Sequence, residues 1–400
     1  MTTMQLKSGL AAMLFTTQFA AVANTGESNA DGADGSAHEL AAVYTADVWH
    51  NTRGGIRTGG AYLDNLDLTL AVDAERAWGW PGVSAFVYGL YNNGRGFSDR
   101  YVGDAMTVSN IDAPEAVRLY EAWVQWVSSA PHGLSLRFGL YDMNSEFDMS
   151  DSRSLFIHSS HGVGHELGQT GQNGPSIFPV TSLALRAAWS PAPQWQVLLA
   201  VFDGVPGDPE HPSSNRIRVN GDDGALAMAE LQWAGGRITK LALGHWQYTA
   251  DFEDLRSTEA APRPPRDDNR GTYAGIEVAL DREIGSDPAT LAFARYGVAQ
   301  DLINEFADSW SVGVRHRGLF VARPDDEVGF AYTRADVSSA FIEPRDGYEA
   351  AIELTYRATL TDWLAIQPNI QFILNPGADP ALDDSLAFGL RLEFSAAARR

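Results

Sequence analysis

Apolar and polar residues alternate with a period of two along most of the chain. In the segment LAIQPNIQFIL at 364–374, leucine, isoleucine and phenylalanine occupy one side, and glutamine and asparagine fall on the other. The segments at 66–73, 351–360 and 386–394 repeat this pattern. Side chains of a strand point alternately to its two faces, so the pattern predicts β-strands with one apolar and one polar face.

About sixteen such segments follow one another, and no comparable helical pattern runs through the chain. They lie near 43–50, 60–73, 82–92, 115–128, 134–142, 181–190, 194–203, 224–233, 238–250, 271–281, 288–299, 309–318, 326–336, 347–360, 363–374 and 385–394. Short turns such as SSAPHG, AGGR and TD alternate with longer loops rich in Asp, Gly, Pro and Asn. This predicts an antiparallel up-and-down transmembrane β-barrel, with short turns at one end and long loops at the other.

A soluble sandwich or propeller is the alternative, because alternation alone does not say which face points inward. Tryptophan and tyrosine prefer the membrane–water interface, where the ring is in apolar surroundings and its polar atom meets water. Several aromatic residues lie at or near predicted strand ends, namely Trp126, Trp189, Trp195, Trp310, Tyr348 and Trp363. Their positions favour the membrane barrel, and sixteen strands leave room for an aqueous channel.

The N-terminus begins with Lys7, a short apolar run and the sequence Ala21-Val22-Ala23, which is typical of a secretory signal peptide. The run is shorter than the roughly 20 apolar residues of a membrane-spanning helix. We therefore expect a signal peptide at 1–23, a flexible leader at 24–42, the barrel at 43–394 and a C-terminal overhang at 395–400. The expected destination is the outer membrane of a Gram-negative bacterium.

Composition excludes several classes of protein. The formal net charge of −22 argues against nucleic-acid binding, which needs a basic surface. The absence of cysteine excludes disulfides and thiolate metal sites. We expect no cofactor and no metal.

Residues 86–178 carry more specific motifs. They include LYEAWVQ at 119–125, G-x-x-D-x-N-x-E-F-D at 139–148, then SLFIHSSHG and PSIFP. This order resembles the carbohydrate-selective outer-membrane porins (the OprB-like family). The resemblance implies a sixteen-stranded barrel that passes glucose-type monosaccharides. Such barrels usually end on an aromatic residue, whereas Phe394 is followed by SAAARR, so the resemblance leaves open how the barrel-assembly machinery reads this end.

If the apolar positions face lipid, the other positions line the channel. On the strand at 115–128, Tyr120, Val124 and Trp126 then face outward. A sugar needs polar groups for its hydroxyls and an aromatic ring for its C–H face, and Trp123 beside Glu121 is the predicted stacking platform. The expected pore-lining residues on the strands are Glu121, Trp123, Gln125, Arg137, Arg186, Arg295 and Arg315. For any single arginine, a salt bridge that only neutralises the lumen is the alternative.

The longest loop, at 143–180, is too apolar for a disordered segment, because it contains Phe147, Leu155 and Phe156. We expect it to fold inward and narrow the pore. The residues expected at the constriction are Asp142, Asn144, Glu146, Asp148 and Arg153. The loop also contains three histidines, His158, His161 and His165, without metal-motif spacing on a predicted helix. We expect them to serve as hydrogen-bonding or structural groups.

These observations predict a porin for passive diffusion of small sugars, without catalysis. A general non-selective porin is the alternative, and a membrane or periplasmic β-rich enzyme is a further one. The expected partners are small carbohydrate solutes, outer-membrane lipid and the barrel-assembly machinery, with a monomer or a trimer as the assembly.

Overall fold

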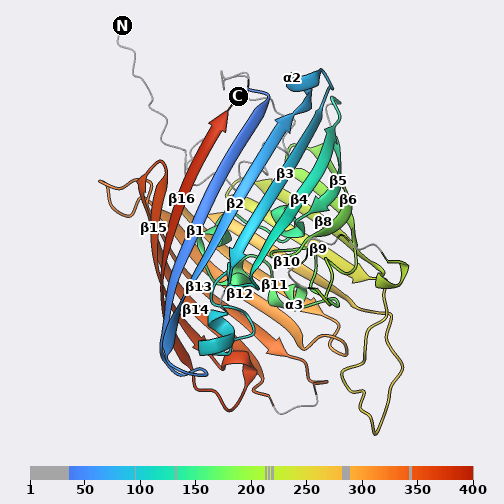
Figure 1. Ribbon diagram of the computed structural model, residues 1–400, viewed down its shortest axis with the longest axis vertical. Coiled ribbons are helices and arrows are strands. Elements are labelled where there is room, and N and C mark those ends of the chain that lie inside the picture. Colours follow the sequence, from blue (N-terminus) through green and yellow to red (C-terminus); the bar gives the residue numbers. More distant parts are fainter. Residues whose placement is uncertain are drawn as a thin grey trace.

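The computed structural model describes residues 36–399 except 95, 131–132, 212–213, 215–216, 218–219, 282–288 and 342–344. Sixteen antiparallel strands form one closed barrel in chain order, and β1 pairs with β16 to close it (Figure 1). The strands are β1 (His38–Arg53), β2 (Gly59–Asp73), β3 (Val83–Asn93), β4 (Ala116–Val127), β5 (Leu134–Tyr141), β6 (Ser182–Ala192), β7 (Trp195–Asp203), β8 (Ala225–Gly235), β9 (Ile238–Tyr248), β10 (Arg270–Ala279), β11 (Thr290–Ala299), β12 (Phe306–Arg317), β13 (Glu327–Val337), β14 (Tyr348–Thr361), β15 (Leu364–Leu374) and β16 (Ser385–Arg399). The predicted barrel and its strand number are confirmed.

The two ends of the barrel differ. The start of β1 and the end of β16 lie at the same end, shown at the top of Figure 1. The turn between β14 and β15 lies at this end, and so does the turn between β8 and β9. The four longest connections, at 94–115, 142–181, 204–224 and 249–269, leave from the opposite end. The predicted alternation of short turns and long loops is therefore present.

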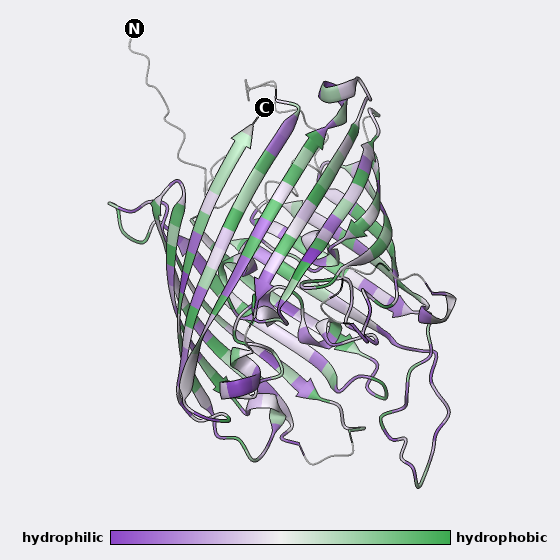
Figure 2. Ribbon diagram, viewed as in Figure 1, coloured by the Kyte–Doolittle hydropathy of each residue, from purple (hydrophilic) through white to green (hydrophobic). Residues whose placement is uncertain are grey.

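The barrel is apolar outside and polar inside, the reverse of a soluble β-protein. On β5, Leu134, Leu136 and Phe138 are exposed, whereas Ser135 and Arg137 between them are buried. Figure 2 shows the same alternation as bands of hydrophobic and hydrophilic colour along the strands. Such a barrel fits a lipid surround, which solvates the apolar outer band.

Tryptophans mark the rim at the end of the short turns. Trp126, Trp189, Trp195 and Trp363 lie at or beside strand ends there, and each has between 42% and 53% of its surface exposed. Trp195 also packs against Trp233 of the neighbouring strand. These residues form the interfacial belt that the aromatic positions predicted.

The described helices are short. The α-helices are α2 (Ala74–Trp78), between β2 and β3, and α3 (His165–Gly168), inside the long β5–β6 connection. Asp73 caps α2 by accepting a hydrogen bond from the Arg76 backbone N–H. In the described residues, no helix has the length and apolar character needed to cross a membrane.

Two predicted boundaries and one predicted side-chain direction are wrong. Residues 38–42, predicted as leader, belong to β1, and residues 395–399, predicted as overhang, belong to β16. The two segments pair with each other, from Glu39 with Arg399 onward, so each satisfies the backbone groups of the other. The predicted signal peptide lies outside the described residues.

Tyr120, predicted to face outward, is buried. The register between β3 and β4 shifts at this point. Tyr88 pairs with Glu121, and the next residue, Gly89, pairs with Leu119. Tyr120 is therefore the extra residue of a β-bulge. Its hydroxyl donates to the carboxylate of Asp142 at 2.6 Å. A single extra residue therefore reverses the direction that strict alternation predicts.

Candidate functional site

The connection from β5 to β6, residues 142–181, lies inside the barrel; we call it the constriction loop. Its backbone and side chains contact inward-facing residues of strands on widely separated parts of the wall, including β6, β8, β10, β11 and β14. Phe147, Leu155 and Phe156 are buried in these contacts. The loop thus packs against the wall with the same apolar residues from which inward folding was predicted.

Carboxylates of the wall accept hydrogen bonds from the backbone of the constriction loop. Glu230 of β8 accepts from the N–H of Asp148 at 2.8 Å, and Glu277 of β10 accepts from the N–H of Ser152 at 2.6 Å. Glu353 of β14 accepts from the N–H of Ile157 at 2.7 Å and from that of His158 at 3.1 Å. Buried N–H groups need partners, and these three strands supply them.

At the start of the loop, Glu146 forms ion pairs with two arginines of the wall. Its carboxylate accepts from Arg186 Nε and Nη2, both at 2.8 Å, and lies 3.5 Å from Arg137 Nη1. Gln125 of β4 accepts from the same two arginines, at 2.8 to 3.1 Å. All of these groups are buried, so the arginines bind the loop and are not open to a solute.

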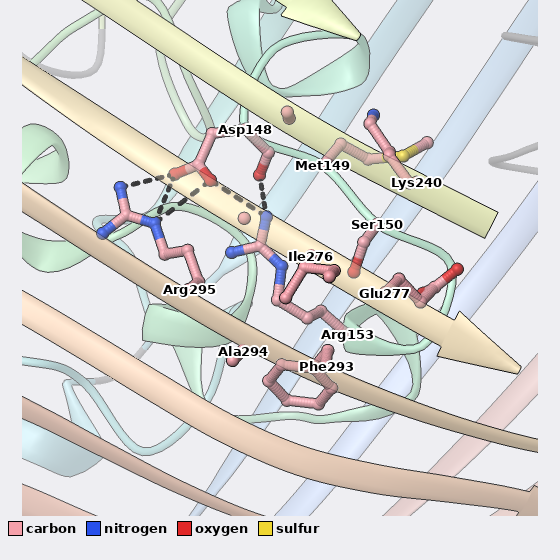
Figure 3. A pocket seen from close by; sticks show the side chains of 12 residues that line it. Asp148, Met149, Ser150, Arg153, Lys240, Ile276, Glu277, Phe293, Ala294 and Arg295 are labelled. Carbon is pink, nitrogen blue, oxygen red and sulfur yellow. Dashed lines mark hydrogen bonds and ion pairs between the residues drawn. The ribbon is translucent and has the colours of Figure 1, made fainter. Parts of the chain in front are cut away.

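A second buried ionic cluster lies on the β11 side of the barrel (Figure 3). Arg295 donates to Asp148 at 2.9 to 3.1 Å and to Glu166 at 2.7 Å, and Arg153 Nη2 lies 3.0 Å from Asp148. The cavity beside this cluster measures only about 20 Å³, room for a single water molecule. The loop and wall are therefore packed closely here.

The arginines keep the loop carboxylates ionised. Burial raises the pKa of Glu146 and of Asp148, but the adjacent guanidiniums outweigh this effect. The pKa of each carboxyl consequently lies below its ordinary value. Glu146 and Asp148 thus each form a charged pair with the wall at neutral pH.

Trp123 is not the predicted stacking platform. Phe86 of β3 stacks on its ring with centroids 5.2 Å apart, and the guanidinium of Arg137 of β5 lies 3.9 Å from its centroid. These residues come from the two strands that flank β4, and the Trp123 side chain is buried. Its indole N–H donates to Glu121, which is also buried. No open ring face is left for a sugar.

The loop histidines form part of the packing. His158 and His161 are each 1% exposed, and His161 packs against Phe156 and Phe293. Burial lowers the pKa of His158 to about 3 and that of His161 well below its ordinary value, so both are neutral at pH 7. His165 packs its ring against Phe306 with centroids 4.6 Å apart.

In the described part of the chain, the one group of three potential metal ligands close enough to share an ion comprises Asp208, Glu210 and His211. It lies in the β7–β8 connection, whereas the three loop histidines lie in the β5–β6 connection.

The β3–β4 connection, residues 94–115, also folds against the inner wall, which the sequence did not predict; we call it the second loop. Glu349 of β14 accepts from the N–H groups of Ala105 and Met106, both at 2.8 Å. Gln371 of β15 donates to the carbonyl of Val108 at 2.9 Å. In both loops, polar side chains of the barrel strands therefore form hydrogen bonds with the loop backbone.

The other predicted site residues fall into two groups. Arg315, with 14% of its side chain exposed, pairs with Glu327 and donates to the Asp151 carbonyl at 2.8 Å. Asp142 and Asn144, in contrast, are half-buried. Asp67 of β2, Tyr88 of β3, and Arg391 and Glu393 of β16 are half-buried too. Asp67, Tyr88 and Arg391 were missed, although their inward parity on alternating strands could have identified them.

A family model described as "Carbohydrate-selective porin, OprB family" matches residues 57–395. The chain belongs to this family. Its place is accordingly the outer membrane of a Gram-negative bacterium, and its family and fold are those of a channel for carbohydrates. Long connections of such barrels face the outside of the cell.

Individual proteins are similar to this chain in sequence, and solved structures are similar to it in fold. Porin B of Pseudomonas aeruginosa is 25% identical over 378 residues, 84% of this chain and 82% of that protein. The putative porin QuiX of Acinetobacter baylyi is 20% identical over 86% of each chain. The high-pH structure of Pseudomonas putida OprB has a TM-score of 0.79 at 21% identity, covering 90% of this chain and 94% of that one. An anion-selective porin from Comamonas acidovorans has a TM-score of 0.55 at 12% identity, covering 90% of this chain and all of that one.

Proposed function

We propose that this porin carries out passive, selective diffusion of glucose-type monosaccharides into the periplasm. The observation that carries the proposal is the constriction loop, which is fixed inside the barrel by buried ion pairs and by wall glutamates. A filled lumen limits the size of solutes that pass. A barrel of sixteen strands without such a loop would be a wide channel.

The proposed path runs along the constriction loop, beside half-buried polar residues of β2 and β16. Asp142 and Asn144 of the loop border it, together with Asp67 and Glu393 of the wall. Amide and carboxylate oxygens accept hydrogen bonds from sugar hydroxyls, whereas the Asn144 amide N–H groups already donate to the Phe147 and Gly162 carbonyls. Because every group is polar and only half-buried, binding is weak, as transport requires.

The buried arginines have a different role in this proposal. Arg137, Arg186 and Arg295 set the width of the path by holding the loop, and solutes do not touch them. The excess of acidic residues, with a net charge of −22, favours neutral or cationic solutes over anions. No catalytic step is part of the proposal.

The test is liposome swelling with glucose, a disaccharide and an uncharged amino acid of similar size to glucose. The proposal expects fast entry of glucose, slower entry of the amino acid and very slow entry of the disaccharide. Rates that follow solute size alone would show a general non-selective porin. No swelling, with the protein inserted, would show that the loop closes the barrel.

A further inference from the structure

Tyr88 of β3 and Trp123 of β4 both point into the barrel, but solutes reach their rings differently. Trp123 is buried between Phe86, whose ring stacks on it, and the guanidinium of Arg137. Tyr88 is half-buried. A solute in the lumen therefore reaches part of the Tyr88 side chain, whereas the Trp123 ring is covered.

The aromatic neighbours of Tyr88 are perpendicular to it. Tyr120 meets its ring at 78° with centroids 4.9 Å apart, and Phe86 meets it at 80° with centroids 6.3 Å apart. Within the described residues, no ring stacks parallel to Tyr88 and no guanidinium lies over it. Tyr88 thus lacks the stacked cover that closes Trp123.

The hydroxyl of Tyr88 fixes the orientation of the ring. It donates to Asp67 Oδ1 of β2 at 2.7 Å, and the side-chain amide of Asn65 donates to the same oxygen at 2.5 Å. A ring that is already held in place loses little conformational freedom when a solute binds to it.

Two carboxylates beside Tyr88 keep an oxygen for a solute. Asp67 uses Oδ1 for Tyr88, and Glu393 of β16 uses Oε1 for Arg357, at 2.7 Å. In the described part of the chain, no group donates to Asp67 Oδ2 or to Glu393 Oε2. Both residues are half-buried and lie on the inner wall on either side of β1, where they pair with positions two residues apart.

This arrangement matches the two surfaces of a monosaccharide. A pyranose presents C–H groups on its faces and hydroxyls around its edge. An aromatic ring packs against the C–H face, and carboxylate oxygens accept hydrogen bonds from the hydroxyls. An uncharged amino acid of similar size has no such face and gains less from the ring.

We infer that Tyr88 is the residue on which a monosaccharide stacks as it passes the constriction loop, while Asp67 and Glu393 accept hydrogen bonds from its hydroxyls. The inference rests on the proposed function, since it concerns the same solutes. It assigns the preference for sugars to one ring, separately from the size limit that the constriction loop sets. A single ring with few hydrogen bonds binds weakly, as transport requires.

Titration of the single-channel ion current with glucose in planar bilayers tests the inference, because bound sugar blocks the current. Tyr88→Leu and Tyr88→Met both remove the ring, so either one that folds as a heat-modifiable barrel suffices. Tyr88→Phe keeps the ring and removes only the hydroxyl. The matched control is Tyr62→Leu, the same change at a residue of β2 that is 43% exposed on the outer wall.

The half-blocking glucose concentration should rise about fivefold when the ring is removed, from the loss of the aromatic contact. In Tyr88→Phe it should change less than about twofold, because the ring remains. Tyr62→Leu should equal the wild type. Liposome swelling with the uncharged amino acid should be the same in all of these proteins.

An unchanged half-blocking concentration without the ring, in a channel whose wild type favours glucose over the amino acid, overturns the inference and leaves the proposed function intact. An equal rise in Tyr88→Phe also overturns it, because the hydroxyl and not the ring would then be responsible. Amino-acid entry that changes as much as glucose block overturns it too, since the ring would then only shape the pore. Wild-type protein that does not favour glucose in swelling overturns the proposed function itself.

Discussion

The constriction loop and the β9–β10 connection, residues 249–269, both take part in arginine–aspartate pairs, but in different surroundings. Asp148 of the constriction loop pairs with Arg295 of β11, and the two side chains are each 2% exposed. In the β9–β10 connection, Arg266 and Asp268 pair at 2.7 Å with 25% and 29% exposed. The chemistry is the same, and the difference lies in the access of water. Because water screens an exposed pair, we expect the buried pair to contribute more to holding its loop in place than the exposed one.

The largest effect should follow from Arg295→Met. This change leaves the carboxylates of Asp148 and Glu166 buried without their main cation, which costs about 3 to 5 kcal/mol. We expect the constriction loop to leave its position on the β11 side, so that single-channel conductance rises and a disaccharide enters faster. Planar-bilayer recordings and liposome swelling measure both.

The matched control for that change is Arg266→Met in the β9–β10 connection. Its guanidinium is solvent-exposed, so conductance and swelling should equal those of the wild type. If Arg266→Met changed conductance and swelling as much as Arg295→Met, burial of the ion pair would not explain the difference between the loops.

A smaller effect is expected from Glu353→Leu on β14, three strands from β11. It removes the acceptor of the Ile157 and His158 N–H groups, and each buried N–H left without a partner costs about 1 to 3 kcal/mol. Hydrogen exchange at these two amides should become faster, while amides near Glu146 keep their protection. Protection that is unchanged at all sites would show that the wall glutamates do not hold the loop.

The next effect is a dependence on pH that only the constriction loop should show. A solvent-exposed histidine has a pKa of about 6.5, whereas burial lowers that of His158 to about 3. Above pH 6.5 the histidine is neutral in both the packed and the released loop. As pH falls below 6.5, only the released loop takes up a proton. The free-energy advantage of the packed loop over the released loop therefore falls by about 1.4 kcal/mol per pH unit for each such histidine, until the pH reaches the lowered pKa.

Current fluctuations of single channels should accordingly increase between pH 7 and pH 5. His161→Phe should reduce this increase, since phenylalanine keeps the packing with Phe156 and Phe293 and does not titrate. Fluctuations that are independent of pH would contradict the account of the buried histidines. If the fluctuations increase equally in the variant, titrating groups other than His161 cause the effect.

The smallest effect is expected at Arg256, which pairs with Asp254 in the β9–β10 connection at 2.6 Å. Arg256→Ala should change neither conductance nor solute preference, because water replaces the lost contacts. Altered conductance would show that this connection also reaches the solute path.

The strands were predictable from the sequence because alternation is a local signal. Each of the sixteen predicted segments overlaps a strand, and Phe147, Leu155 and Phe156 correctly indicated a loop that buries itself. The pairing of Glu146 with Arg186, 40 residues away, depends on register and barrel closure, which no local pattern contains.

Trp123 and Tyr120 show the same limit at single residues. The alternation of side chains along the strand correctly predicted that Trp123 points inward. It did not predict that Phe86 and Arg137, from the two neighbouring strands, cover its ring. Tyr120 turned inward because one bulge shifts the register. Parity indicates that Glu353 points inward, but not that it binds the loop, because a single inward carboxylate in a strand has the same appearance whether it binds a loop or faces water.

The most direct test of the central claim, that the constriction loop sets the size limit, is the ratio of glucose to disaccharide swelling rates in the wild type and in Arg295→Met. The account predicts a high ratio in the wild type that falls toward one in the variant, with folded, heat-modifiable barrel in both. A ratio that remains high in the variant would contradict it, because size selection would then come from a part of the barrel that Arg295 does not hold.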